Sequence, residues 1–329
     1  MTQPLSAFQR RQAGQKAYEH IFEHGLYNST TPAPKGTLRG IDVLPHEVVR
    51  QKINRTVKIY YGHRDELPDL TAPQTFFEKL AIAKFFAPIP MPSPADKLNV
   101  QSFIPDDLTS EIATIEVVWS GDQPITAALI EQLDLPAGTY FAKSSGGTGR
   151  NIRFTVPLET KQAARIETLS TGWLVDKHGE RAGEWWYNLM RSRNFIERDL
   201  TPESGSLTDW KFHCGGGEVL AVQVDLDRHS QHRQTMYDAD FRHIPEEMFF
   251  EYGPPETAPP FFDSMRNIAR RIAAEFEFVR VDMYHANDRL YLGELTLAPM
   301  GGLRLPRSPH LDAHMGAAWV SDFMGTRAP

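Results

Sequence analysis

The chain has 329 residues, of which 41% are hydrophobic and 23% charged, and its formal net charge is −7. This length predicts two or three domains or subdomains, and the composition is that of an ordinary globular protein. The acidic balance argues against a general nucleic-acid-binding protein, because such proteins usually carry an excess of Lys and Arg that neutralises phosphates. The single cysteine, Cys214, excludes an intramolecular disulfide and a cysteine-rich zinc site.

The hydropathy pattern indicates a protein of the cytoplasm. Residues 1–19 are polar and lack the apolar core of a signal peptide. No apolar run reaches the length needed to cross a bilayer. We therefore expect a cytoplasmic protein with no integral membrane segment and no nucleic-acid partner, and the sequence is compatible with a homodimer.

The N-terminal part is expected to be helical, with helices over 6–23, 46–61 and 71–86, and a proline-rich extended stretch follows over 87–94. Strands with one intervening helix come next, at 114–119, 139–143, 151–157, the helix 160–174, and 195–200. The last part is expected to contain strands at 208–214 and 218–225, a helix at 261–276, and strands at 278–284 and 289–295. This mixture predicts an α+β fold with antiparallel sheets. We divide it into a mostly helical region over 1–94, a central part over 95–200 and a C-terminal part over 201–329.

Two acidic residues, Asp282 and Glu294, lie on the last two predicted strands. Residues 285–288 make a good turn between these strands, so we expect the two carboxylates to face each other with Cβ atoms about 5 Å apart. Side-chain alternation places Arg280 and Thr296 on the same face. Facing carboxylates repel unless a cation or proton lies between them, and Mg²⁺ prefers oxygen ligands of this kind. From these residues alone, a magnesium site and a surface hairpin in which Arg280 neutralises both acids are equal alternatives.

A glycine-rich segment over 143–151 joins two predicted strands. Its glycines would allow backbone N–H groups to approach phosphate oxygens, and Lys143 at the strand end could reach a phosphate. The segment is not a Walker loop, because Gly-Lys-Ser/Thr is absent, and it is not a dinucleotide fingerprint, because it leads into a strand. A loop over a nucleotide and a plain hairpin both fit, and the segment alone favours the plain hairpin.

Two further features suggest weaker interpretations. Arg304 and Arg307 follow the second acidic strand after a pair of glycines and could bind the carboxylate of an acceptor, although a plain surface role for Arg304 fits equally well. Cys214 lies in a strand pattern and is expected to be a core residue and not a nucleophile.

Several motifs follow one another over residues 72–316. They are Pro73-Gln74-Thr75-Phe76-Phe77-Glu78-Lys79-Leu80, Ala95-Asp96-Lys97, Phe141-Ala142-Lys143 with the glycines after it, Glu197-Arg198-Asp199-Leu200, Asp209-Trp210-Lys211-Phe212-His213-Cys214, Asp227-Arg228, Tyr237-Asp238, Arg280-Val281-Asp282-Met283-Tyr284 and Gly293-Glu294-Leu295-Thr296. Together these motifs resemble the TupA-like ATP-grasp family, which is named for a teichuronopeptide biosynthesis protein. An ordered set of this kind is far more specific than any one of its members.

The resemblance implies an ATP-grasp fold in which two α+β subdomains, 95–200 and 201–329, clasp ATP after an N-terminal helical region. It implies ATP and Mg²⁺ as cofactors. ATP phosphates would meet Lys97, Lys143, Ser145, Gly146, Gly147 and Lys211. The adenine would meet Glu197, Arg198 and Leu200 on the hinge strand. Lys211 and Arg280 would be catalytic at the γ-phosphate, and the metal would be held by Asp282, Glu294 and Thr296.

This sequence departs from the family pattern at a few of these positions. The last metal position is commonly asparagine in ATP-grasp ligases and is Thr296 here, which leaves the third protein ligand open. Gln101 stands where an arginine is expected, and Ser145 and Gly146 stand where histidine and asparagine are often found.

The activity implied by the resemblance is that of an ATP-dependent carboxylate–amine ligase. The carboxylate attacks the γ-phosphate and gives an acyl phosphate plus ADP, and an amine then displaces phosphate. A uronic acid sugar and an amino acid or peptide would be the substrates, joined on a cell-surface polysaccharide, such as a capsule, or its precursor. The alternatives are a peptide ligase of natural-product biosynthesis, an ATP-dependent sugar kinase without an acyl step, and a nucleotide-binding protein without catalysis.

Overall fold

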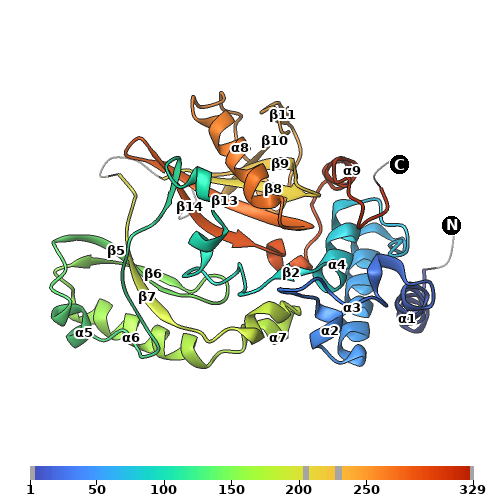
Figure 1. Ribbon diagram of the computed structural model, residues 1–329, viewed down its shortest axis with the longest axis horizontal. Coiled ribbons are helices and arrows are strands. Elements are labelled where there is room, and N and C mark those ends of the chain that lie inside the picture. The colour runs from blue at the N-terminus through green and yellow to red at the C-terminus, as the bar shows by residue number, and fades with distance from the viewer. Residues whose placement is uncertain (1–3, 203–206, 227–231, 327–329) are drawn as a thin grey trace. The chain divides into compact units, whose positions relative to one another are not determined.

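The computed structural model describes residues 4–202, 207–226 and 232–326. By its internal contacts the chain divides into two compact units. The first unit comprises Met1–Pro92, Thr208–Asp282 and Thr296–Pro329, and the second comprises Ser93–Leu207 and Met283–Leu295. Each unit contains helices and strands (Figure 1), so the predicted α+β fold is confirmed. The predicted division of the chain at residues 94 and 200 stays a prediction. The motif at Asp227 and Arg228 lies outside the described residues.

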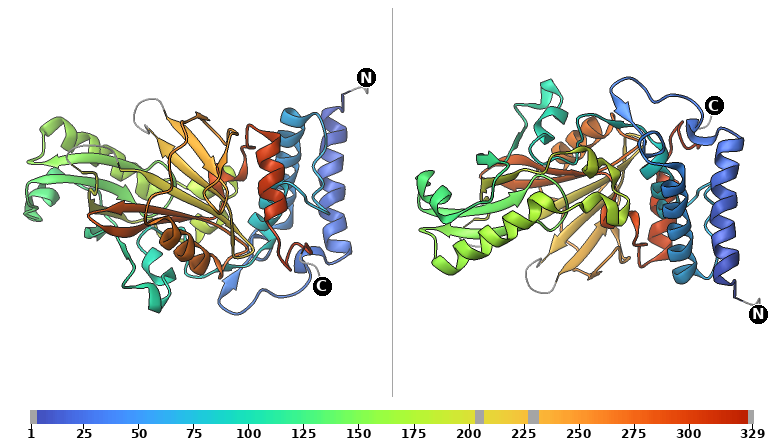
Figure 2. Two further views of the ribbon diagram at one scale, coloured as in Figure 1. Left: turned by 90° about the horizontal axis from the view of Figure 1, so that it is seen from above. Right: turned by 90° about the horizontal axis from the view of Figure 1, so that it is seen from below.

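The long helices of the first unit are α1 (Ala7–Glu23), α3 (His46–Arg64), α4 (Phe76–Phe86), α8 (Phe262–Ala273) and α9 (Pro309–Ala318). Helix α1 packs on α3, and α4 contacts both α3 and α9, as the two views of Figure 2 show. Ser6 begins α1 with a capping box, in which its hydroxyl accepts from Gln9 N–H while the Gln9 side chain accepts from Ser6 N–H. The predicted start of α4 at residue 71 is wrong. The cap is Thr75, whose hydroxyl accepts from the N–H of Glu78, so the helix begins at Phe76.

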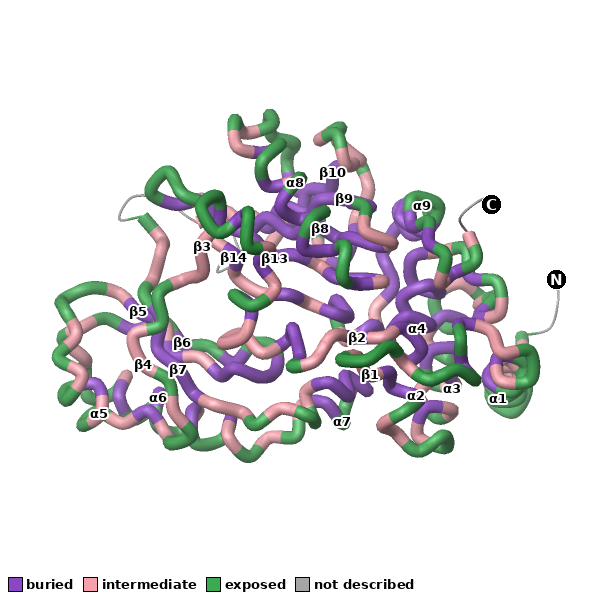
Figure 3. The backbone as a smooth tube through the Cα atoms, in the orientation of Figure 1, coloured by how far each residue is buried: buried purple, intermediate pink, exposed green. Residues whose placement is uncertain are grey.

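Helix α4 is buried along its whole length, as Figure 3 shows. The first turn of α4 is joined to both ends of α9. The Asp312 carboxylate on α9 accepts a hydrogen bond of 2.9 Å from Phe77 N–H at the start of α4. In return, Lys79 Nζ donates to the carbonyl oxygens of Gly316 at 2.8 Å and Trp319 at 2.6 Å, where α9 ends. The motif at residues 73–80 therefore builds the scaffold of the first unit.

Among the described residues, the larger sheet has eight strands, in the order β11-β10-β9-β8-β13-β14-β3 with β12 paired to β10. Its strands are β3 (Ile112–Thr114), β8 (Asp209–Gly215), β9 (Glu218–Leu226), β10 (Arg233–Tyr237), β11 (His243–Ile244), β12 (Glu251–Tyr252), β13 (Phe278–Ala286) and β14 (Arg289–Thr296). Helix α8 packs on β8 and β9. The predicted four-residue turn at 285–288 is wrong, because the strands extend to Ala286 and Arg289. The turn is Asn287 and Asp288 alone, with φ of 50° and 57°, a conformation that a two-residue hairpin requires and that Asn and Asp tolerate.

The smaller sheet lies in the second unit and has the order β4-β7-β5-β6, all antiparallel. Its strands are β4 (Val117–Gly121), β5 (Gly138–Ser144), β6 (Asn151–Val156) and β7 (Asn194–Arg198), and α6 (Thr160–Val175) shares their core. The core contains Tyr140, Phe154, Ile166 and Ile196. The predicted strand at 114–119 is wrong as a single element, because its two ends belong to β3 and β4 in different sheets.

The remaining elements are short: α2 (Gly40–Val43), α5 (Ala127–Gln132), α7 (His178–Ala182), β1 (Thr37–Leu38), β2 (Ile89–Pro90), and the 3₁₀ helices η1 (Leu26–Asn28), η2 (Val100–Phe103), η3 (Asp106–Leu108), η4 (Trp185–Leu189) and η5 (Pro299–Gly302). Cys214 is buried in β8, so its predicted place in the core is confirmed. Burial raises the pKa of its thiol, which keeps it protonated and unreactive. In the described ranges we find no helix that combines the length and apolarity needed to span a bilayer.

Candidate active site

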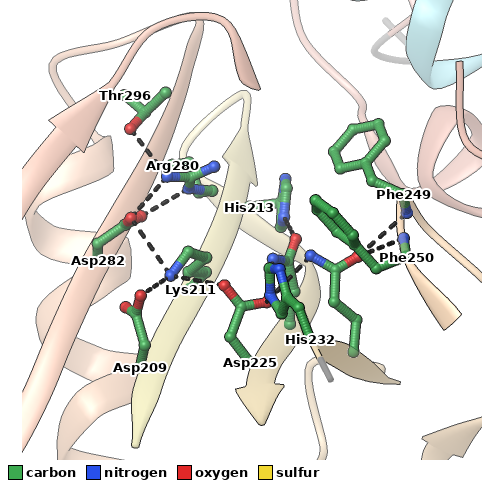
Figure 4. A network of polar contacts seen from close by, with 12 residues as sticks. Asp209, Lys211, His213, Asp225, His232, Phe249, Phe250, Arg280, Asp282 and Thr296 are labelled. Atoms are coloured by element: carbon green, nitrogen blue, oxygen red, sulfur yellow. Dashed lines mark hydrogen bonds and ion pairs between the residues drawn. The ribbon is translucent and has the colours of Figure 1, made fainter. Parts of the chain in front are cut away.

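Lys211 on β8 is surrounded by three aspartates of the first unit, one on the same strand and two on the neighbouring strands β9 and β13 (Figure 4). Asp209 lies two residues earlier on β8 and its carboxylate forms an ion pair with the Lys211 ammonium. Lys211 Nζ also lies 3.1 Å from Asp225 Oδ2 on β9 and 3.8 Å from Asp282 Oδ2 on β13. All four side chains are at most 5% exposed. The predicted γ-phosphate lysine is therefore held by carboxylates within the sheet.

The aspartates determine the charge state of this lysine. Burial alone would lower the pKa of Lys211, but the carboxylates of Asp209, Asp282 and Asp225 outweigh burial and raise that pKa above its ordinary value. Burial would in turn raise the pKa of Asp225, but Lys211 and hydrogen-bond donors hold it below its usual range. Lys211 is thus a fixed, buried positive charge.

Arg280 on β13 forms a bidentate pair with Asp282. Its Nε donates to Asp282 Oδ1 at 2.6 Å and its second amino group donates to Asp282 Oδ2 at 2.6 Å. The same amino group donates to Thr296 Oγ1 at 3.1 Å at the end of β14. The predicted placement of Arg280, Asp282 and Thr296 on one face is therefore confirmed. A bidentate, charge-assisted pair of this kind fixes the orientation of the Arg280 guanidinium relative to the Asp282 carboxylate.

Asp225 extends the cluster toward the edge of the sheet through two glutamines. Its Oδ1 accepts hydrogen bonds from Gln223 Nε2 at 2.8 Å and Gln234 Nε2 at 3.0 Å. Gln234 Oε1 in turn accepts from the backbone N–H groups of Phe249 and Phe250, at 3.1 and 3.2 Å. Sequence reasoning did not identify Asp225 or the glutamines. The available signal was the spacing of polar residues at 223 and 225 within a strand that is otherwise apolar.

His213 is the third polar residue of β8 and is fully buried. Its Nε2 lies 3.0 Å from Gln223 Oε1. Burial, aided by the charge of Arg280, lowers the pKa of His213 to about 3. His213 is therefore neutral at physiological pH and adds no charge to the Lys211 cluster.

The second unit gathers a separate group of predicted site residues. Lys97 Nζ donates to Gly147 O in the glycine-rich loop at 2.8 Å and lies 3.9 Å from Glu294 Oε2. Lys143 at the end of β5 forms an ion pair with Glu197 on β7. Burial lowers the pKa of Lys97, Glu294 opposes that effect, and the nearby charge of Lys143 adds to it. Two lysines and two carboxylates thus lie around one glycine-rich loop.

Residues 160–320 match the family described as TupA-like ATPgrasp. This part of the chain is a TupA-like ATP-grasp domain. Over residues 160–320 the match confirms the predicted family and its ATP-grasp fold. The predicted site residues inside the TupA-like domain are Glu197, Arg198, Leu200, Lys211, Arg280, Asp282, Glu294 and Thr296, and those that precede it are Lys97, Lys143, Ser145, Gly146 and Gly147.

Neighbouring residues on the predicted hinge strand of the TupA-like domain point to opposite faces. Glu197 lies on the face of Lys143, whereas Arg198 pairs with Glu116 at 2.9 Å and is half-exposed. Leu200 lies two residues beyond the end of β7. The roles of these residues at adenine stay predictions.

Hydrogen bonds hold the glycine-rich loop, which precedes the TupA-like domain, in its conformation. Ser145 is buried, and its hydroxyl oxygen accepts from the N–H of Arg193 at 3.1 Å. Gly146 O accepts from Ser144 Oγ at 3.1 Å and from an Arg150 amino group at 3.2 Å. Gly147 has φ of +87° and would bring an added Cβ within 2.8 Å of Arg150 Nε, so its glycine identity is required by the fold.

The two predicted metal carboxylates of the TupA-like domain belong to different units, with Asp282 in the first and Glu294 in the second. Their pairing around a metal stays a prediction. Within the first unit the structure brings together Lys211, Arg280, Asp282 and Thr296, and within the second it brings together Lys97, Lys143, Gly147, Glu197 and Glu294.

Solved structures similar to this chain include an ATP-grasp ligase, a D-alanine–D-alanine ligase and a carboxyaminoimidazole synthase. The ATP-grasp ligase PsnB complexed with a minimal precursor has 14% identity and a TM-score of 0.36, over 68% of this chain and 60% of PsnB. D-Alanine–D-alanine ligase from Helicobacter pylori has 10% identity and a TM-score of 0.39, over 71% of this chain and 61% of the ligase. N5-Carboxyaminoimidazole synthase from Aspergillus clavatus has 16% identity and a TM-score of 0.38, over 72% of this chain and 52% of the synthase. No curated protein matches the chain.

Proposed function

We propose that the protein is an ATP-dependent carboxylate–amine ligase that forms a C–N bond and releases ADP and phosphate. The observation that carries the proposal is the buried Lys211 cluster inside a TupA-like ATP-grasp domain. Burying an ammonium and several carboxylates costs free energy unless they are paired, and an apolar core would not need them. A phosphoryl-transfer site needs fixed positive charge and metal-binding oxygens at one place.

The residues of the first unit fit a magnesium ion. Asp209, Asp225 and Asp282 place three buried carboxylates around Lys211. Arg280 pairs with Asp282, and His232 Nε2 lies 3.3 Å from Asp225 Oδ1. Carboxylate oxygens are the ligands that Mg²⁺ prefers.

In this proposal Asp282, Glu294 and Thr296 hold Mg²⁺, which when bound would offset negative charge on the phosphate oxygens. The phosphates meet Lys97, Lys143, Lys211 and the loop residues Ser145, Gly146 and Gly147. The adenine meets Glu197, Arg198 and Leu200. Lys143 is paired with Glu197. When the nucleotide binds, Lys143 would move to a phosphate, and the Glu197 carboxylate would then accept a hydrogen bond from the adenine amino group.

The chemistry proceeds in two steps. An oxygen of the substrate carboxylate attacks the γ-phosphorus, and the bond between that phosphorus and the ADP oxygen breaks, giving an acyl phosphate. Lys211 and Arg280 stabilise the charge that builds on the transferring group. An amine nitrogen then attacks the acyl carbon, phosphate leaves with the C–O bond electrons, and the nitrogen loses a proton to solvent. Arg280 stabilises the tetrahedral oxyanion of this second step.

The proposed substrates are a uronic acid sugar and an amino acid or peptide, joined in the cytoplasm on a cell-surface polysaccharide or its precursor. The polysaccharide setting rests on the resemblance of the motifs to the TupA-like family. A peptide ligase of natural-product biosynthesis would use the same residues, and a sugar kinase would omit the acyl step. These alternatives differ in their products.

The test is to incubate the protein with Mg-ATP, pooled amino acids and uronic acids, and to identify products by mass spectrometry. An amide together with ADP and phosphate supports the ligase, whereas a phosphorylated sugar without phosphate release would overturn it. Glu294→Gln should abolish turnover with the fold intact. Glu131→Gln, on the exposed side of α5, is the matched control and should turn over normally. Wild-type turnover in Glu294→Gln would remove the metal assignment.

A further inference from the structure

Arg304 is held in place by two aromatic rings and a backbone carbonyl group. Its guanidinium carbon lies 5.1 Å from the ring centre of Phe250 and 5.9 Å from that of Phe249. One amino group donates to the carbonyl oxygen of Phe249. Over the residues that the structure describes, Arg304 forms no ion pair, although its neighbour Arg307 pairs with Glu247 at 3.2 Å. Arg304 is therefore a half-buried cation whose charge no described carboxylate neutralises.

The segment that carries Arg304 is fixed against the segment that carries the two rings. Arg307 N–H donates to Met248 O at 2.7 Å, and Ser308 N–H donates to Glu247 O at 3.1 Å. These backbone bonds hold residues 307–308 beside residues 247–248. An arginine stacked on rings and fixed by its own backbone loses little conformational freedom when it binds an anion.

A continuous chain of polar contacts runs from Arg304 to the Lys211 cluster inside the first unit. Arg304 donates to Phe249 O. The N–H groups of Phe249 and Phe250 donate to Gln234, and Gln234 donates to Asp225, which contacts Lys211. Figure 4 shows Phe249, Phe250, Asp225 and Lys211 of this chain of contacts. The position of the Arg304 guanidinium is therefore set relative to the lysine that we assign to the γ-phosphate.

We propose that Arg304 is the receptor for a carboxylate group on the substrate of the ligase reaction. This inference rests on the proposed function and names the substrate class of the same site. The planar guanidinium fork matches a carboxylate, and charge-assisted hydrogen bonds of this kind are the strong ones. The carboxylate comes either from a uronic acid or from an amino acid or peptide, and the experiment separates these two sources.

The experiment compares probes that differ only by a carboxylate. D-Galacturonate is paired with D-galactose, and L-alanine with L-alaninamide. Binding of each probe is measured by calorimetry in the presence of Mg²⁺ and AMPPNP, a non-hydrolysable ATP analogue, so that the readout does not depend on turnover. Phosphate release with ATP is measured separately. The variants are Arg304→Met, which removes the charge, and Arg304→Lys, which keeps the charge but loses the planar fork. Arg242→Met, an exposed arginine paired with Asp238 and Asp240, is the matched control.

We expect the wild type to bind one carboxylate probe more tightly than its neutral counterpart. Arg304→Met should weaken that probe about ten- to hundredfold, as the loss of a charged hydrogen bond predicts, and Arg304→Lys should weaken it less. The affinity for AMPPNP and the Arg242→Met control should not change. Equal binding of acids and neutral counterparts by the wild type, or unchanged binding by both Arg304 variants, would overturn the inference.

The two proposals fail in different ways. If no probe leads to phosphate release but the carboxylate preference is lost in Arg304→Met, the receptor stands and the ligase proposal falls. Far-UV circular dichroism and a thermal transition for each variant show whether the fold is kept. If Arg304→Met does not fold, Arg304→Lys decides, because it retains both the charge and the side-chain length.

Discussion

Replacing the buried Asp312 by Asn is expected to remove a pH-dependent loss of stability. The Asp312 side chain is 1% exposed. Its carboxylate accepts from Phe77 N–H at the start of α4 and lies 3.6 Å from an Arg64 amino group. Burial raises the pKa of Asp312 to about 6, and the Phe77 hydrogen bond and Arg64 only partly oppose this effect. The folded protein therefore binds this proton more tightly than the unfolded chain does.

The sign and size of the effect follow from that difference. A rise from the ordinary pKa of 3.8 to about 6 corresponds to about 3 kcal/mol of folding free energy. This contribution is fully present below the unfolded pKa of 3.8 and is lost as the pH rises through about 6. Asparagine cannot ionise, yet its side-chain oxygen can still accept from Phe77 N–H. Asp312→Asn should therefore match the wild type in acid and exceed it in stability by up to about 3 kcal/mol at neutral pH.

The assay is urea unfolding of both proteins at a series of pH values from about 4 to about 7.5, with the difference in unfolding free energy taken at each pH. Taking the difference cancels the other titrating groups. Arg64→Met should widen the gap, because the Arg64 charge lowers the pKa of Asp312. A difference that stays constant across this range would refute the reasoning, since it would mean that the carboxyl titrates equally in the folded and unfolded states.

Three further outcomes are expected. Gln234→Glu places a second carboxylate against Asp225 in place of an amide donor 3.0 Å away. Thermal unfolding should show that the free energy of unfolding falls by about 1–3 kcal/mol at pH 8 and recovers at lower pH as the new side chain is protonated. A loss that does not depend on pH would contradict this. Gly316→Ala would put a Cβ 2.1 Å from a backbone carbonyl oxygen and should lower the free energy of unfolding by about 1–3 kcal/mol. The control Gly172→Ala, with nothing within 4 Å of the added Cβ, should be neutral or stabilising. Equal melting temperatures of the two variants would argue against the predicted clash. Lys97→Met should raise the KM for ATP by about tenfold or more, and an unchanged KM in steady-state kinetics would remove Lys97 from the phosphate site.

Elements with a local signal could be predicted from the sequence. Ser6 and Gln9 form the capping box that begins α1, and the alternating patterns that predict β5 and β6 coincide with the observed strands. The start of α4 was predicted wrongly although Thr75 and Glu78 form the same kind of capping box. The additional bond from Phe77 N–H to Asp312, which lies far away in sequence, could not be predicted.

In the candidate site, too, some contacts could be predicted from the sequence and others could not. Arg280 and Asp282 are two residues apart on one strand, so alternation alone predicts their contact. Asp225 and Gln234 matter only because β9 and β10 pair in a register that puts these two residues opposite each other. A sequence shows which face of a strand a residue occupies but not which residue faces it on the next strand. For this reason Asp225 and the glutamines Gln223 and Gln234 were missed.

The hydrogen bonds between α4 and the α9 region have a consequence for the synthesis of the protein. On the ribosome, α4 emerges early, while α9 and the carbonyl groups that bind Lys79 are encoded near the other end of this sequence. At usual rates of synthesis, the intervening residues take on the order of tens of seconds to appear. During that time the apolar surface of α4 lacks its α9 partner and is open to wrong associations. Synthesis of α9, and not of α1 or α3, therefore supplies the groups that Phe77 N–H and Lys79 bind, and a chain that stops before α9 leaves α4 without these contacts.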